Sequence, residues 1–233
     1  MQEFSIIVRL KFQKRSELKF VSRTIPQSGG YNTPKLALGF IRVILLFFVL
    51  TTAACGSLRY SQIDPAAKDF HPQRIAVFPA LDVSTYEEAR GNVEQIAADV
   101  LRDKKWFAEV IDPTGLDKQI KTNEELRKAM ADYLSKLKLL NFSDPDLAKK
   151  IGELAKVDAF LLLSVDSWNY AVENKDKDKV AKVSIGMKLI EASTGKIMWK
   201  GGQHKVEGYM LIKPELTSVA RSVILDMVGF MPR

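Results

Sequence analysis

The feature that most constrains the fold is the apolar run at residues 159–165, AFLLLSV, which is the most apolar segment after residue 55. A run of this length, rich in large apolar residues, is typical of a strand rather than a helix. Because both of its alternating faces are apolar, the strand is predicted to lie at the centre of a sheet and to be buried on both sides. The rest of the chain must then supply neighbouring strands and the helices that cover them.

Four further strands are predicted from short segments of β-branched and aromatic residues. They are residues 74–79, 106–111, 180–190 and 196–199, the last two forming an antiparallel pair that turns at Thr194-Gly195. Gly201-Gly202 interrupts the last strand and predicts a bulge or bend. Residues 173–179, ENKDKDK, are predicted to form a solvated turn before the pair.

Four helices are predicted from apolar residues at helical spacing and from their end signals. Residues 87–104 carry acids at the front and bases at the end, Thr122 and Glu125 form a capping box, Pro145 lies in a first turn, and Pro214 opens the last helix. The order β-α-β-α-α-β-β-β-α predicts an α/β fold with a single mixed β-sheet and flanking helices.

Upstream of this domain, residues 43–55 read VILLFFVLTTAAC, an uncharged run that follows Arg42 and ends at the only cysteine. A basic flank, a short apolar stretch and small residues before a cut are typical of a secretory signal peptide. We therefore predict that residues 36–54 are a signal peptide. Because the segment ends on Cys55, it resembles a bacterial lipoprotein signal, which implies that Cys55 is lipidated and becomes the first mature residue.

Two features leave alternatives open. Thr52 stands where lipoprotein signals usually carry leucine, which implies slow processing. An uncleaved anchor over residues 36–54 would hold the protein in the inner membrane instead, although Arg42 within it costs about 2.5–3.5 kcal/mol of insertion free energy. A buried free thiol at Cys55 is the remaining alternative.

The chain divides into four segments on this reading. Residues 1–35 are predicted to be an extension from a misassigned translation start, or a disordered tail, because Pro26, Gly29, Gly30 and Pro34 break any helix. Residues 36–54 are the signal peptide. Residues 55–72 are the lipidated cysteine and a polar, flexible tether. Residues 73–233 form the α/β periplasmic domain.

The distribution of charge argues against a nucleic-acid partner. The net charge is +7 and the pI about 9.3. Residues 1–55 hold eight Lys and Arg against two Glu, which leaves 27 basic and 26 acidic residues in the rest. The mature chain is therefore nearly neutral and lacks the basic excess that binding to phosphates requires.

Several motifs together resemble a known class of envelope protein. They are the cysteine at position 55, RIAVFP at 74–79, KVDAFLLLSVDSW at 156–168, and STGKIMWKG at 193–201. The set is similar to bacterial envelope lipoproteins with a TolB amino-terminal-like or curli-secretion-lipoprotein-like α/β domain. The resemblance implies membrane attachment through lipid on Cys55, envelope protein partners and possible oligomers. Gly56, which is not the inner-membrane retention residue Asp, implies the periplasmic face of the outer membrane.

No catalytic constellation is found in the sequence. The two histidines, His71 and His204, match no metal-ligand pattern, and no nucleophile or nucleotide motif occurs. Asp158 and Asp166 share a strand face but lie about 27 Å apart at 3.3–3.4 Å per residue, too far to act on one bond. The tryptophans are predicted to be core residues: Trp106, Trp168 and Trp199.

The predicted function is therefore that of a non-enzymatic subunit or accessory of an envelope complex for secretion, transport or cell-wall synthesis, without cofactor or metal. The alternative is an envelope hydrolase or a small-ligand-binding protein whose site the motifs do not show. A pocket with convergent acidic or hydroxyl groups would favour that alternative.

Overall fold

The computed structural model describes residues 58–81, 86–173 and 178–232, all within one compact unit, Cys55–Arg233. The predicted signal peptide, the lipidation site Cys55 and the middle of the predicted charged turn lie outside the described residues. None of the described helices is long and apolar enough to cross a membrane.

The described residues form six strands, a short 3₁₀ helix and five α-helices. The strands are β1 (Tyr60–Ile63), β2 (Arg74–Val77), β3 (Glu109–Ile111), β4 (Ala159–Glu173), β5 (Asp178–Glu191) and β6 (Ile197–Tyr209). The helices are η1 (Pro65–Asp69), α2 (Glu87–Lys104), α3 (Pro113–Thr122), α4 (Glu124–Leu140), α5 (Pro145–Ala155) and α6 (Leu216–Val228).

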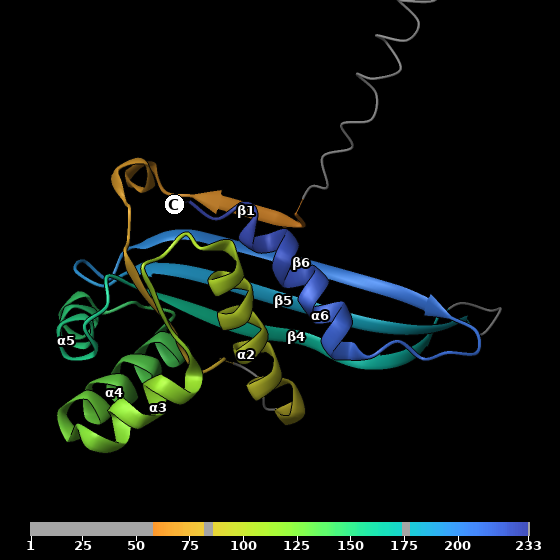
Figure 1. Ribbon diagram of the computed structural model, residues 1–233, viewed down its shortest axis with the longest axis horizontal. Helices are drawn as coiled ribbons and strands as arrows, with labels where there is room; N and C mark the ends of the chain where they lie inside the picture. The colour runs from red at the N-terminus through yellow and green to blue at the C-terminus, as the bar shows by residue number, and fades with distance from the viewer. Residues whose placement is uncertain (1–57, 82–85, 174–177, 233) are drawn as a thin grey trace, which may run out of the picture. The chain divides into compact units, whose positions relative to one another are not determined.

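All the strands belong to one mixed sheet, in the order β1-β6-β5-β4-β2-β3. β2 is parallel to both β3 and β4, whereas β4, β5, β6 and β1 pair antiparallel (Figure 1). The predicted fold class, an α/β fold with a single mixed sheet and flanking helices, is confirmed. Because β4 joins the parallel part to the antiparallel part, it takes the central position predicted for residues 159–165.

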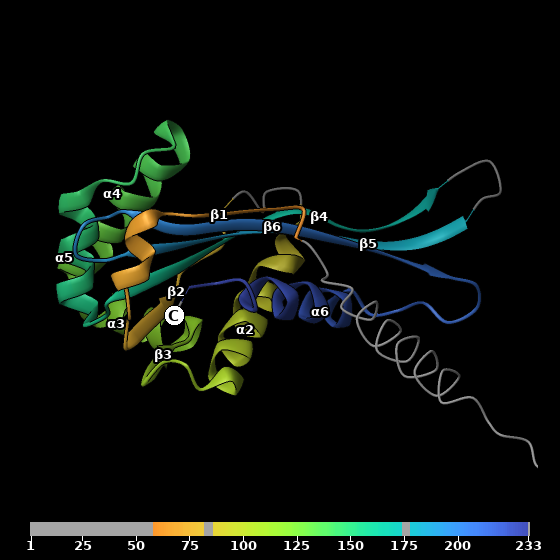
Figure 2. The same ribbon diagram turned by 90° about the horizontal axis from the view of Figure 1, so that it is seen from above.

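Two hydrophobic clusters sandwich the sheet. Leu161 and Leu163 of β4 point into the cluster shared with α2 and α6, and Phe160 and Leu162 point into the cluster shared with α3, α4 and α5. Figure 2 shows α4 on one side of the sheet and α2 and α6 on the other. The alternation of a strand thus buries both faces of the run, as predicted.

The predicted flexible tether is wrong for residues 58–72, which belong to the folded domain. β1 adds to the edge of β6, with Ile63 opposite Trp199. Asp64 then caps η1 by accepting the Ala66 N–H at 2.8 Å, and its carboxylate is 2.8 Å from Lys196 Nζ. A polar, aperiodic segment can be fixed in this way because an edge strand needs backbone partners rather than an apolar face.

The helix boundaries correct two details of the predicted elements. Asn123, not Thr122, caps α4 by accepting the Leu126 N–H at 3.0 Å, while the Thr122 hydroxyl donates back into α3. α3 was not predicted as a separate helix; Asp112 caps it by accepting the Gly115 N–H at 2.7 Å. Pro145 lies in the first turn of α5 as predicted, behind the cap Asp144.

Gly201-Gly202 forms neither a bulge nor a bend, because both residues keep the regular register of β6 against β5. The glycines are explained by close packing on both faces. A Cβ on Gly202 would lie 2.3 Å from Tyr60 Cε1, and a Cβ on Gly201 would lie 2.6 Å from Trp199 Cζ2. The rings of Tyr60 and Trp199 therefore lie against bare backbone.

Candidate interaction surface

The strands β4, β5 and β6 extend far beyond the rest of the sheet. β2 pairs with β4 at residues 159–161, with one further bridge at Ser164, and β1 pairs with β6 at residues 199–202. Beyond these points, no other described strand lies beside β4 or β6. We call residues 165–173 of β4, 178–186 of β5 and 203–209 of β6 the distal ribbon; it runs to the right in Figure 1.

One face of the distal ribbon is covered by α6. Trp168 of β4 and Val183 of β5 belong to the same buried cluster as Val219 and Val223 of α6. Lys205 on β6 donates to Ser222 Oγ on the helix at 3.0 Å. Packing and this polar contact therefore hold the part of the ribbon near Trp168 and Lys205 to α6, whereas Val172, farther along the same face, is 63% exposed.

The opposite face of the distal ribbon has no described helix over it (Figure 2). Strand alternation and register place Asn169, Lys182, His204 and Val206 on this face. Asn169, His204 and Val206 are exposed. Towards β2 the same face carries Phe160, buried under α4 and α5. The sheet therefore changes, along single strands, from a covered apolar face to an open polar one.

The apolar end of this ribbon is its second feature. Between β6 and α6, Met210, Leu211 and Ile212 are 91%, 97% and 87% exposed. Lys213 Nζ follows them and sits 3.5 Å from the centroid of the Tyr170 ring, whose hydroxyl donates to the Pro214 carbonyl at 2.7 Å. The base of the loop is thus fixed while its three apolar side chains face outward.

The two aspartates considered from the sequence have separate roles. Asp158 accepts the backbone N–H groups of Gln73 and Arg74 at 2.9 and 2.8 Å, which joins the start of β2 to β4. Asp166 lies at a bulge in β4, accepts from Ser184 Oγ at 3.2 Å, and is 3.9 Å from an Arg59 nitrogen. The structure does not bring the two carboxylates together.

A pocket of about 400 Å³ lies at the carboxyl end of β2 and holds the one buried carboxylate among the described residues, Glu94. Burial raises the pKa of Glu94, and its Oε1 accepts the Ala80 N–H at 2.6 Å. Thr114 and Asp117 also line the pocket. The buried carboxylate holds the loop after β2 in place, and no described cysteine or serine lines the pocket beside it. The polar side chains of this recess are therefore Arg90, Glu94, Thr114 and Asp117.

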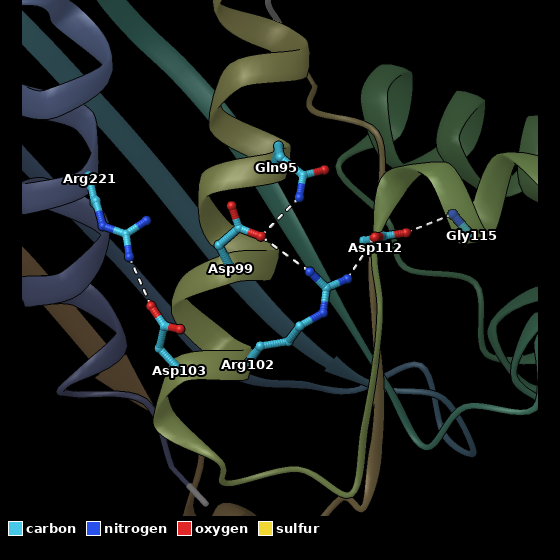
Figure 3. A network of polar contacts seen from close by, with 7 residues as sticks. All are labelled: Gln95, Asp99, Arg102, Asp103, Asp112, Gly115 and Arg221. Carbon is cyan, nitrogen blue, oxygen red and sulfur yellow. Dashed lines mark hydrogen bonds and ion pairs between the residues drawn. The ribbon is translucent and has the colours of Figure 1, made fainter.

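A polar network on α2 joins this helix to its neighbours α3 and α6. Arg102 on α2 donates to Asp99 and to Asp112, the cap of α3, at 3.2 and 2.6 Å, and Gln95 donates to Asp99 at 2.9 Å (Figure 3). One turn along, Arg221 of α6 donates to Asp103 at 2.8 Å. The hydrogen bond from Gly115 and the ion pair with Arg102 lower the pKa of Asp112. α2 is thereby tied to α3 and α6.

The remaining predicted residues form no site in the part of the chain that is described. His71 and His204 are both exposed, and no described group of His, Cys, Asp and Glu could hold a metal ion. Trp168 and Trp199 are buried as predicted, and Trp106 is partly buried against the same cluster. The extension of β6 beyond the predicted strand 196–199 was missed by sequence reasoning, because residues 203–209, QHKVEGY, show no apolar alternation.

Comparison with known proteins adds distant structural likenesses only. No protein-family model matches the chain, and no curated protein matches it. Among solved structures, a variant PelC dodecamer from Paraburkholderia phytofirmans has a TM-score of 0.48 at 18% identity, covering 74% of this chain and 96% of that chain. Lipoprotein GNA1162 from Neisseria meningitidis has a TM-score of 0.47 at 18% identity, covering 68% of this chain and 99% of that chain.

A third solved structure, a minor lipoprotein from Acinetobacter baumannii, has a TM-score of 0.32 at 8% identity, covering 67% of this chain and 87% of that chain. Two of these three proteins are named as lipoproteins, the class expected from the sequence, and none is named as TolB. At these scores the likenesses carry no argument about function, which must rest on the geometry of the chain itself.

Proposed function

We propose that this protein is a lipid-anchored, non-enzymatic docking subunit of a bacterial envelope complex. Lipid on Cys55 would hold it at the periplasmic face of the outer membrane, as the residues 43–56 imply. Acyl chains stabilise such attachment by about 0.8 kcal/mol per buried methylene, so more than one chain gives a stable anchor. The folded domain would then present the distal ribbon to a partner protein.

The observation that carries this proposal is the free edge of β6 at residues 205–209. β1 stops at Tyr60, opposite Gly202, and the His204 N–H donates to Gln203 Oε1 at 3.1 Å, so the part of this edge that has no described strand beside it begins at Lys205. Neither a proline nor a register shift interrupts this edge, two devices by which proteins block strand addition. An extended segment of a partner can therefore add as a further strand.

Two of the acidic side chains that line the recesses hold backbone N–H groups, which supports a non-enzymatic role. Glu94 holds the Ala80 N–H, and Asp158 holds two N–H groups at the start of β2. Asp158 lines the second recess, of about 550 Å³, together with the exposed His71. General acid–base catalysis needs a group within hydrogen-bond reach of substrate, and these carboxylates are committed to the backbone.

Site-specific photocrosslinking in living cells tests the docking edge. A benzophenone amino acid replaces Val206, which is exposed on the free strand, and, as the control, Lys128, which is exposed on α4. We expect an adduct with an envelope protein from position 206 and none from position 128. The mass of the adduct separates a different protein from a second copy of this chain. Absence of any adduct at position 206 would refute docking through this edge.

The anchor is tested by Cys55→Ser. We expect the variant to leave the membrane fraction, because the thiol that would carry the lipid is gone. Intact-mass measurement of the wild-type protein should show an acylated Cys55 as the first residue. A variant that stays in membranes at the mass of the uncleaved chain would instead support an anchor formed by residues 36–54.

A further inference from the structure

We propose that the loop Met210-Leu211-Ile212 inserts into the interface of the same lipid bilayer that holds Cys55, so that the domain has two membrane contacts. This inference rests on the lipid anchor of the proposed function and adds an orientation to it. The loop would make the end of the distal ribbon a membrane-facing surface, separate from the strand edge of β6.

The chemistry of the loop matches a membrane interface. Its three large apolar side chains are almost fully in water and are more exposed than Leu139, Leu140 and Phe142, the exposed apolar residues at the end of α4, which are 76%, 68% and 51% exposed. Tyr209 precedes them and Lys213 follows them. Tyrosine is enriched at the headgroup level, and lysine can bury its stem while its ammonium stays in water. Apolar residues between such flanks are typical of interfacial segments.

The loop is built to keep these side chains exposed. Tyr170 packs edge-on against Tyr209 at a centroid distance of 6.0 Å, its ring lies beneath Lys213 Nζ, and its hydroxyl holds the Pro214 carbonyl. Residues on both sides of the loop are therefore fixed to β4. Because the base is held, the side chains at 210–212 cannot fold back onto the core without breaking these contacts.

The direction of β1 places its first residue, Tyr60, towards the end of β6 that carries the loop. β1 is antiparallel to β6, and its register runs from Ile63 opposite Trp199 to Tyr60 opposite Gly202. The chain before Tyr60 therefore leads towards the end of β6 that carries the loop. Figure 1 shows β1 entering from the side of the distal ribbon.

The length of the intervening chain fits this arrangement. Cys55 is three residues from Leu58, a reach of at most about 11 Å at 3.3–3.6 Å per residue. Along β6, Met210 lies eight residues beyond Gly202, roughly 26 Å at 3.3 Å per residue. From Tyr60, opposite Gly202, the five residues back to Cys55 cover at most about 18 Å of that distance. The acylated residue can thus lie near the loop, and one bilayer surface can hold both.

Depth-dependent fluorescence quenching tests the contact. The full chain is purified with its lipid and reconstituted into vesicles, and Leu211→Cys then carries the single free thiol for an environment-sensitive fluorophore, because acylation consumes Cys55. Lys128→Cys is the control, an exposed polar position on α4, away from the distal ribbon. We expect lipids brominated on their acyl chains to quench the probe at position 211 at least about twofold more than the probe at position 128.

The outcomes separate this inference from the proposed function. Equal quenching at the two positions in a protein whose mass shows acylated Cys55 refutes the loop contact and leaves the anchor intact. An unmodified mass at Cys55 refutes the anchor and removes the basis of the inference. A blue shift of the probe at position 211 that appears without vesicles, and grows with protein concentration, assigns the loop to a second copy of the chain and also overturns the inference.

Discussion

The two halves of the long strands differ in what covers them. Near β2, Phe160 and Leu161 of β4 alternate between two buried clusters, with helices on both faces of the sheet. In the distal ribbon the same strand alternates between Trp168, packed against α6, and Asn169, open to water. One strand thus serves as a core element and then as a surface element.

The difference separates the part of the sheet that stabilises the fold from the part that is exposed for interaction. Apolar burial, which contributes about 25 cal/mol per Å² of apolar area, is concentrated in the covered half. The distal ribbon keeps one face, two strand edges and an apolar end available among the described residues. Substitutions in the two halves should therefore have unequal effects on stability.

The largest expected effect is in the covered half. Phe160 is fully buried, stacks on Phe78 at a centroid distance of 4.5 Å and meets Tyr133 edge-on at 6.0 Å. Phe160→Ala should lower the free energy of unfolding by about 3–5 kcal/mol, because it removes apolar burial and leaves a cavity. Denaturant unfolding measures this. Val172→Ala in the distal ribbon, where the side chain is 63% exposed, is the control and should stay within about 0.5 kcal/mol of wild type.

A second pair of variants sharpens the comparison within β6 itself. A Cβ at Gly202 would meet the Tyr60 ring, whereas a Cβ at Gly208 would have nothing within 4 Å. Gly202→Ala should destabilise the fold by about 1–3 kcal/mol, because the Tyr60 ring must leave its position against the backbone of β6. Gly208→Ala should be neutral or stabilise by about 0.4–1 kcal/mol, through the lower entropy of the unfolded chain. Equal effects in thermal unfolding would contradict the assigned packing of Tyr60.

The smallest expected effect is on the pH dependence of the free energy of unfolding, through the buried carboxyl group of Glu94. Because burial raises the pKa of Glu94 above its ordinary 4.5, the folded state holds the proton more tightly than the unfolded state. Its contribution to stability is therefore largest below pH 4.5 and falls as the pH rises through the folded pKa. Glu94→Gln keeps an oxygen for the Ala80 N–H and should remove this fall. Chemical unfolding across the pH range measures it, and parallel curves for the two proteins would contradict it.

The sequence predicted the elements whose signal is local. The apolar run 159–165, the helical spacing of 87–104 and Pro145 at a helix start indicated the class of fold correctly, because periodicity and end signals depend only on neighbours in the chain. The assignment of Cys55 as a lipid site is of the same kind and stays a prediction. Residues 58–72 were misjudged, because an edge strand of polar residues has no periodic signal.

What only the tertiary structure decided depends on contacts between distant segments. The sequence by itself determined that 159–165 is a central strand and that no familiar catalytic motif occurs after residue 55. It could not determine that β1 stops at Tyr60, that Gly202 is required by the Tyr60 ring, or that helices cover only part of one face. Strand pairing and helix placement are set by long-range packing. Because β1 ends at Tyr60 and no described helix covers the end of the ribbon, β6 keeps a free edge and the loop at 210–212 lies in water.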